Sequence, residues 1–151
     1  MAKTPLVDFD IDGGRNLVHA LEKAGLPISI AAWLCLQDSA DWQLFIATPD
    51  VQTYGPTTII KFVDRIRSAI NSPVRLDKVT VTNTTNHFIN NIPLFSYHSE
   101  AQPLHRFRGG FLGDVDIEDG LIYKIDRTVK ASKAAPRPNA EAIRKARSIA
   151  A

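Results

Sequence analysis

Two histidines near position 100 are the residues best placed for acid–base chemistry in this chain. His98 and His105, with Arg106 beside the second of them, have the composition of a metal-independent ribonuclease site. Such a site needs one histidine neutral and the other protonated near neutral pH. The other histidines, His19 and His87, have no partner at metal-ligand spacing. A small hydrolase or nuclease built on His98 and His105 is therefore one hypothesis for the function.

Residues 8–13, which read D-F-D-I-D-G, match the opening of a calcium-binding EF-hand loop. Asp8, Asp10 and Asp12 would supply its first ligands. The twelfth position of such a loop needs a bidentate carboxylate, and here it is His19. Because half a loop cannot supply enough oxygen ligands, we expect an acidic lead-in whose Asp12 caps the first helix, and no bound metal.

The same string is similar to the D-x-D-G nucleophile motif of haloacid-dehalogenase-like phosphatases, and Asp114, Asp116 and Asp119 resemble their magnesium-binding acids. The resemblance implies a phosphatase that holds magnesium. The sequence departs from that pattern at Gly14, which stands where those enzymes carry threonine, and no clear strand precedes the motif. We therefore expect the second acidic cluster to be the charged side of a hairpin, and we expect no cofactor.

The single cysteine, Cys35, lies in the apolar run Ile28–Leu36 and is expected to be buried. A lone cysteine forms no internal disulfide, and a thiol in apolar surroundings is a poor nucleophile. No stretch reaches the ~18 consecutive apolar residues that a membrane helix needs, and the N-terminus carries acids rather than the apolar core of a signal peptide. The sequence predicts a cytoplasmic protein with no membrane partner.

Charge is distributed unevenly along the chain. Residues 1–126 hold 11 lysines and arginines against 15 acids, a net charge of −4, whereas residues 127–151 hold 7 against one, a net charge of +6. The C-terminal cations are Arg127, Lys130, Lys133, Arg137, Arg144, Lys145 and Arg147. Such a basic tail can follow a phosphate backbone, dock on an acidic protein or on the acidic body of a second copy, or simply keep the chain soluble.

A second basic feature is the run H-R-F-R-G-G-F at residues 105–111. Arg106 and Arg108 can reach phosphates while the phenylalanines stack on bases, which is how single-stranded nucleic acid is held. The alternation of cation and aromatic also has the period of a strand whose arginines point outward. We expect the strand, with Arg106 and Arg108 as candidate binding residues.

Hydrophobic periodicity and turn residues predict the element order α-β-β-α-β-(α)-β-β. The expected helices cover residues 12–25, residues 55–71 and, as a short helix, residues 85–92. The expected strands are Ile28–Leu36, Trp42–Ala47, Val74–Thr82, Arg106–Ile117 and Leu121–Ile125. The first two strands should form a hairpin, and Asp119-Gly120 should turn the chain between the last two. Beyond residue 126 we expect a linker over residues 127–138 and then a short helix capped by Asn139.

The sequence thus predicts an α+β domain over residues 1–126, with a mainly antiparallel sheet of about five strands and helices packed on one face, followed by a basic linker and short C-terminal helix over residues 127–151. The chain has no phosphate-binding glycine loop and no nucleophile elbow, so a non-enzymatic binding protein is the leading hypothesis. Its expected partner is a protein, or a second copy of the chain, bound through the sheet surface and the basic tail. Nucleic acid held by the tail with Arg106 and Arg108 is the alternative, and the hydrolase comes third.

Overall fold

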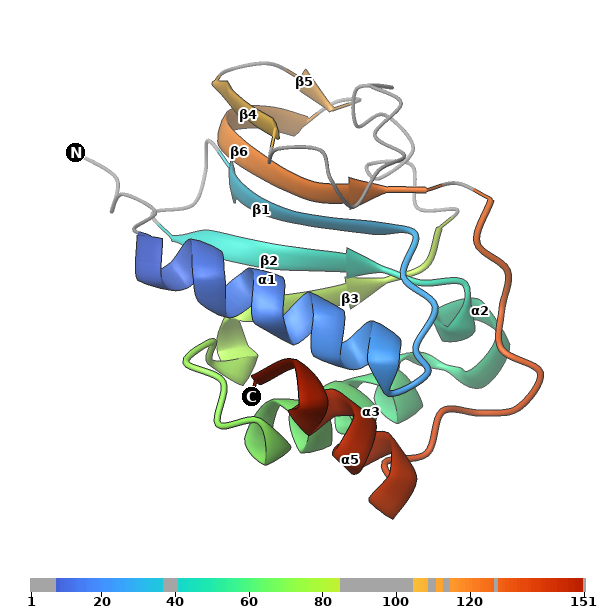
Figure 1. Ribbon diagram of the computed structural model, residues 1–151. Coiled ribbons are helices and arrows are strands. Elements are labelled where there is room, and N and C mark those ends of the chain that lie inside the picture. The colour runs from blue at the N-terminus through green and yellow to red at the C-terminus, as the bar shows by residue number, and fades with distance from the viewer. Residues whose placement is uncertain are drawn as a thin grey trace.

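The structure is a computed structural model, and it describes residues 8–36, 41–84, 105–108, 111–112, 115–126 and 128–150, without the side chains of residues 8, 9, 105–118 and 150. Within these residues the protein is an α+β fold in which a sheet lies against a layer of helices (Figure 1). The α+β class expected from the sequence is confirmed. The predicted short helix over residues 85–92 lies outside the described residues.

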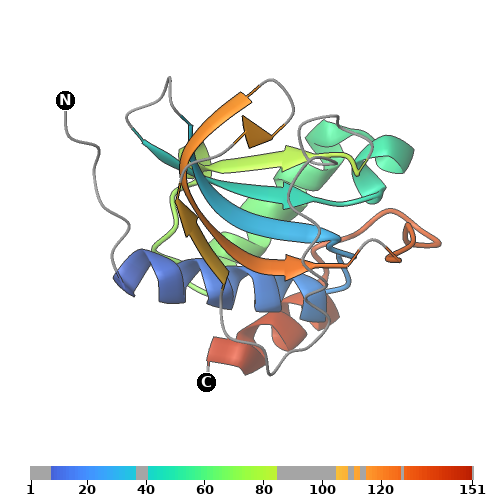
Figure 2. The same ribbon diagram turned by 90° about the horizontal axis from the view of Figure 1, so that it is seen from above.

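Helices and strands follow the chain in mixed order. The helices are α1 (Asp8–Lys23), α2 (Asp50–Tyr54), α3 (Pro56–Ala69) and α5 (Ala140–Ala150), with a short 3-10 helix, η1 (Leu76–Lys78). The strands are β1 (Ile30–Leu36), β2 (Trp42–Ala47), β3 (Val79–Thr82), β4 (His105–Arg108), β5 (Phe111–Leu112) and β6 (Val115–Ile125). Helices α1, α3 and α5 gather on one face of the sheet, and the view from above shows the strands twisting across them (Figure 2).

Within the described residues the sheet is mixed, because one of its five strand pairings is parallel and the other four are antiparallel. Its order is β3-β2-β1-β6-β4, with β5 paired to β6. Strands β1 and β2 form the expected antiparallel hairpin, in which Trp33 pairs with Leu44, but β3 runs parallel to β2. A parallel pair needs a long crossover, which α2 and α3 supply. The strand predicted over Val74–Thr82 is shorter than expected, since η1 precedes Val79.

Strand β6 replaces a predicted hairpin. The sequence places a turn at Asp119-Gly120, and this prediction is wrong because β6 runs unbroken through both residues. Asp119 pairs with Cys35 and Gly120 with Leu34 of β1, while β4 pairs with the same two residues from the other side. Pairing along both edges satisfies the backbone of this central strand and outweighs the local turn preference.

Helix α1 begins at Asp8 rather than at Asp12. Asp12 is therefore an exposed residue inside the helix, and its predicted capping role is wrong. The D-x-D-x-D-G string lies within α1, so it forms neither an EF-hand loop nor the strand end that the phosphatase motif requires. The helix stops as predicted before Gly25, whose φ of 109° lets the Leu26 amide donate to the carbonyl of Leu21 at 3.0 Å.

Side chains of β1 divide between the two faces of the sheet. Trp33 and Cys35 lie in the main core, together with Phe62 of α3. Ile30 and Leu34 lie in a smaller apolar cluster on the opposite face. This period of two places the expected buried cysteine beneath the helices, where it belongs to the packing of the core.

Helix α1 lies close to the sheet at Gly14. Trp33 Nε1 donates to Tyr123 Oη at 2.9 Å, and Tyr123 Oη donates to the carbonyl oxygen of Ile11 at 2.5 Å. A Cβ atom on Gly14 would lie 2.5 Å from Tyr123 Oη and 2.6 Å from Trp33 Nε1. Glycine occupies this helical position because only a hydrogen atom fits between the helix and the two aromatic side chains.

A β-bulge in β6 directs two successive side chains toward α1. The register with β1 shifts between Ala31 and Ala32, which leaves Tyr123 as the extra residue. Tyr123 reaches the N-terminal half of α1, and the next residue, Lys124, pairs through Nζ with Glu22 Oε2 at 2.5 Å near its C-terminal end. In a regular strand these two side chains would point to opposite faces. The bulge therefore attaches both halves of α1 to the sheet.

The substitution Gly14→Ala tests the close contact between α1 and the sheet. Alanine in place of a helical glycine ordinarily stabilises a protein by about 0.5–1 kcal/mol. Here the added Cβ must displace Tyr123 or Trp33, so we expect the free energy of unfolding to fall by about 1–3 kcal/mol. Asn16→Ala, at an exposed position of the same helix, is the control. Urea unfolding followed by tryptophan fluorescence measures both, and a stabilised Gly14→Ala protein would contradict the contact.

Candidate functional site

Several predicted site residues lie outside what the structure describes. Arg106 and Arg108 are on β4, opposite Leu121 and Asp119 of β6, but their side chains are not among the described atoms. The same holds for the side chains of Asp114 and Asp116, for His98 and the side chain of His105, and for Arg127. The acid–base site and the contribution of these arginines to binding therefore stay predictions.

The other six predicted cations lie in two adjoining segments. Lys130, Lys133 and Arg137 belong to residues 128–139, an irregular stretch that we call the strap, and all three are exposed. Arg144, Lys145 and Arg147 are exposed on α5. The strap leads from the end of β6 past α2 to the start of α5 (Figure 1). The basic segment that the sequence predicts as a tail therefore runs over the surface of the fold.

A buried carboxylate fixes the strap to the body. Asp50, in the first turn of α2, is 0% exposed, and its two carboxylate oxygens accept from the Ser132 amide and the Ser132 hydroxyl, each at 2.7 Å. Tyr54 Oη donates to the carbonyl oxygen of Ser132 at 2.5 Å. A buried charge is costly unless it is hydrogen-bonded, so this arrangement strongly favours one position of the strap.

Helix α5 packs against the same core as the rest of the fold. It lies against α1 and α3, and it buries Ala146 completely and most of Ala142. Asn139 Oδ1 accepts from the Ala142 amide at 2.9 Å, which confirms the predicted cap. Arg147 Nε donates to the carbonyl oxygen of Ala69 at the end of α3, at 3.0 Å. The amino-acid composition changes beyond residue 126, but the fold continues, because the C-terminal helix α5 is part of the helical layer.

Helix α3, which packs against α5, carries further cations. Its apolar side chains, such as Phe62 and Ile66, are buried, whereas Lys61 and Arg65 are exposed one turn apart on the opposite side. We call the cations of α3, the strap and α5 the basic face; they are Lys61, Arg65, Arg67, Lys130, Lys133, Arg137, Arg144, Lys145 and Arg147. The concentration of charge at the C-terminus does not indicate the α3 members; the sequence signal for them is their spacing opposite the apolar stripe of the helix.

The charge of this face contrasts with that of the remaining chain. Its segments carry nine cations and two carboxylates, Asp64 and Glu141, a net charge of +7. All other residues together carry nine cations and fourteen carboxylates, a net charge of −5. Arg67 pairs with Asp64 at 2.8 Å and Lys145 with Glu141 at 3.2 Å. A field of one sign over adjoining segments attracts a partner of the opposite sign.

No large apolar residue in the described part of the chain is exposed, although some, such as Phe45 and Ile60, are half-buried. Every exposed residue there is charged, polar, glycine, proline or alanine. Interfaces between proteins usually bury apolar and aromatic anchors at their centre. The described surface is therefore better suited to contacts made by charge than to contacts made by apolar burial.

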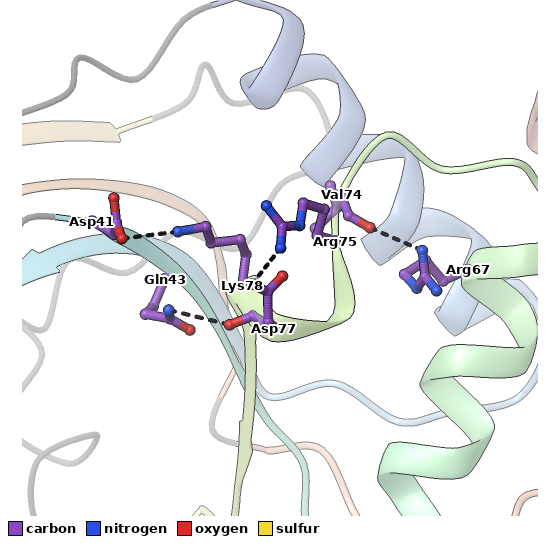
Figure 3. A network of polar contacts seen from close by, with 7 residues as sticks. All are labelled: Asp41, Gln43, Arg67, Val74, Arg75, Asp77 and Lys78. Carbon is purple, nitrogen blue, oxygen red and sulfur yellow. Dashed lines mark hydrogen bonds and ion pairs between the residues drawn. The ribbon is translucent and has the colours of Figure 1, made fainter.

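A second group of charges lies where β2 and β3 begin (Figure 3). Lys78 pairs with Asp41 at 3.2 Å, Arg75 pairs with Asp77 at 2.9 Å, and Gln43 Nε2 donates to the carbonyl oxygen of Asp77 at 3.4 Å. Positive and negative groups balance here. These contacts join β2 to the segment that leads into β3, so they position the parallel strand and add no net charge to attract a partner.

Burial raises the pKa of Tyr123 well above its ordinary value of 10.0, although the hydrogen bond from Trp33 acts in the opposite direction. A strongly shifted pKa often marks a functional group. The Tyr123 hydroxyl, however, lies between α1 and the sheet with both of its hydrogen bonds made inside the protein. The raised pKa of Tyr123 therefore results from its burial between α1 and the sheet.

Comparison with family models, with curated proteins and with solved structures finds no match to this chain. In the part of the chain that the structure describes, no helix is long and apolar enough to cross a membrane. Nor do three or more histidine, cysteine, aspartate or glutamate residues come together there in a way that would hold a metal ion. The basic face remains the feature of the described surface with the most distinct chemistry.

The raised pKa of Tyr123 predicts a loss of stability in alkali. The pKa of Tyr123 is higher in the folded protein than in the unfolded chain, where it is near 10. The contribution of Tyr123 to the free energy of unfolding is therefore complete below about pH 10 and is lost as the pH rises toward the folded pKa. Tyr123→Phe lacks this dependence, and it costs about 1–3 kcal/mol at neutral pH because Trp33 Nε1 loses its acceptor. Urea unfolding between about pH 8 and about pH 11 compares the two proteins. Parallel stability profiles would contradict the assignment.

The contact between Ser132 and Asp50 predicts that the strap and α5 loosen together. Ser132→Ala removes one hydrogen bond to a buried charge, so we expect a loss of about 1–3 kcal/mol in the free energy of unfolding. The substitution should also increase the rate of amide hydrogen exchange, and the increase should be larger in α5 than in α3. Ser68→Ala, on the exposed side of α3, is the control. Unchanged exchange in α5 would mean that the strap does not position the helix.

Proposed function

We propose that this protein is a non-enzymatic binding protein that engages nucleic acid through its basic face, by contacts with phosphate groups. The observation that carries the proposal is the charge contrast: a net +7 on α3, the strap and α5 against −5 on the remaining chain. Nucleic acids present a dense and regular row of negative charges, and neutralising them releases counterions. Charge contacts of this kind need no apolar patch.

The sequence favours a protein partner over nucleic acid. Such a partner would contact the sheet surface as well as the basic residues, and contacts of this kind usually include apolar anchors. The exposed residues that the structure describes offer only small or polar side chains. This composition favours a polyanion as the partner. Binding to an acidic protein instead is one possible result of the test described below.

The exposed part of the basic face also lacks aromatic side chains among the described residues. Proteins that hold single strands stack bases on aromatic rings, whereas contacts with phosphates alone carry no sequence information. We therefore expect binding to depend on the backbone and to vary little with base sequence. A double-stranded ligand suits this mode because its phosphates are closely and regularly spaced.

Fluorescence anisotropy with a labelled DNA duplex tests the proposal. Affinity should fall steeply with salt, and Arg65→Gln should lower the slope of log K against log [salt] by about one, as expected when one phosphate contact is lost. Arg75→Gln is the matched control, because Arg75 is 75% exposed but pairs with Asp77 outside the basic face. It should leave the slope unchanged.

Two results would overturn the proposal. One is the absence of duplex and RNA binding even at low salt. The other is equal sensitivity to Arg65→Gln and Arg75→Gln, which would place the contact elsewhere. Capture of an acidic protein from host extract that survives nuclease treatment and is lost in Arg65→Gln would assign the same face to a protein partner instead.

A further inference from the structure

An open groove lies where the end of α1, the strap and the start of α5 meet. It has a volume of about 430 Å³. Four alanines line it, among them Ala24 and Ala142, together with Arg137, Asn139, Glu141 and Lys145. Roughly 300–1,000 Å³ is the range of sites that hold small ligands. The groove is thus large enough for a phosphate group with its attached sugar.

The polar lining of the groove has unequal numbers of cations and acids. Arg137 is exposed on the strap, and Lys145 and Glu141 form an ion pair at 3.2 Å across one turn of α5. The side chains of that pair are 49% and 67% exposed, so water screens their attraction. A phosphate can take the place of the Glu141 carboxylate next to Lys145 at little cost.

We propose that this groove seats one phosphodiester group of the nucleic-acid backbone, bound by Arg137 and Lys145. The inference rests on the proposed function and names the point at which the backbone enters the basic face. Alanine side chains leave room for the sugar beside the phosphate, and the two cations come from different segments, so they can approach one group from two sides. Charge complementarity selects a phosphate in preference to an apolar or cationic ligand.

Glu141 is then a competitor inside the site. Its carboxylate occupies Lys145 in the unbound protein, and a bound phosphate must displace it. Removing that charge should strengthen binding, which is a result that a misfolded variant cannot produce. A substitution of Glu141 should therefore raise the affinity, whereas the loss of an ordinary contact lowers it.

Duplex DNA binding by the full chain, measured by fluorescence anisotropy, tests the groove. We expect Glu141→Gln to raise affinity by about two- to fivefold, the value of one exposed ion pair. Arg137→Gln and Lys145→Gln should each lower affinity by about five- to tenfold, the value of one charge-assisted contact. Asp64→Asn removes an acid from the basic face outside the groove and is the matched control, with an expected gain smaller than that of Glu141→Gln.

A double-mutant cycle separates local competition from a general change of charge. In the Lys145→Gln background, Glu141→Gln should have no further effect, because Glu141 acts through Lys145. If the gain persists there, or if Asp64→Asn gives the same gain, Glu141 acts only through the net charge and the groove assignment is overturned.

Two further outcomes keep the groove and the proposed function apart. Duplex binding that depends on Arg65 but not on Arg137, Glu141 or Lys145 would overturn the groove and leave the proposed function standing. Failure of the wild-type protein to bind any nucleic acid would overturn both. Inorganic phosphate and a nucleoside monophosphate serve as competitors, and displacement of the duplex at low concentrations of either would identify a small-ligand site and overturn the backbone assignment.

Discussion

The hydrogen bonds that join Trp33, Tyr123 and the Ile11 carbonyl determine where the helical layer lies. They connect a central strand, its neighbour and the first helix through one buried hydroxyl group. Gly14 permits the close approach that these bonds need, and the bulge at Tyr123 turns that side chain toward α1. Helix α5 packs on α1 and α3, so the position of the α5 cations depends in part on this contact.

The second constraint acts at the strap. Helix α5 buries Ala142 and Ala146 and packs the half-buried Ile143 against the core, so apolar burial supplies only part of what holds the helix. Polar contacts supply the remainder: Ser132 on the buried Asp50 carboxylate, and Arg147 on the carbonyl of Ala69. Cations held on anchored segments lose less conformational entropy on binding than cations on a free tail, which makes an ordered basic face a better ligand site than its composition alone suggests.

The sequence predicts the local elements well where one periodicity dominates. The strand Trp42–Ala47 and the helix that starts at Pro56 follow directly from their apolar spacing. One prediction failed where a tertiary contact outweighed a local signal: Asp119-Gly120 resembles a hairpin turn but pairs with β1 and β4. Another failed because the helix begins earlier than expected: Asp12 resembles a cap but lies inside α1. The role of Asp50 was not predictable, because its partner, Ser132, is 82 residues away in the chain.

We propose that α3, the strap and α5 together form the binding surface. Amide chemical-shift mapping by NMR on addition of a DNA duplex tests it most directly, because it locates the contact without any substitution. We expect perturbations that are concentrated in residues 56–69 and 128–150 and that decrease as salt is added. Perturbations confined to the strands at the other side of the sheet, or none at all at low salt, would contradict it.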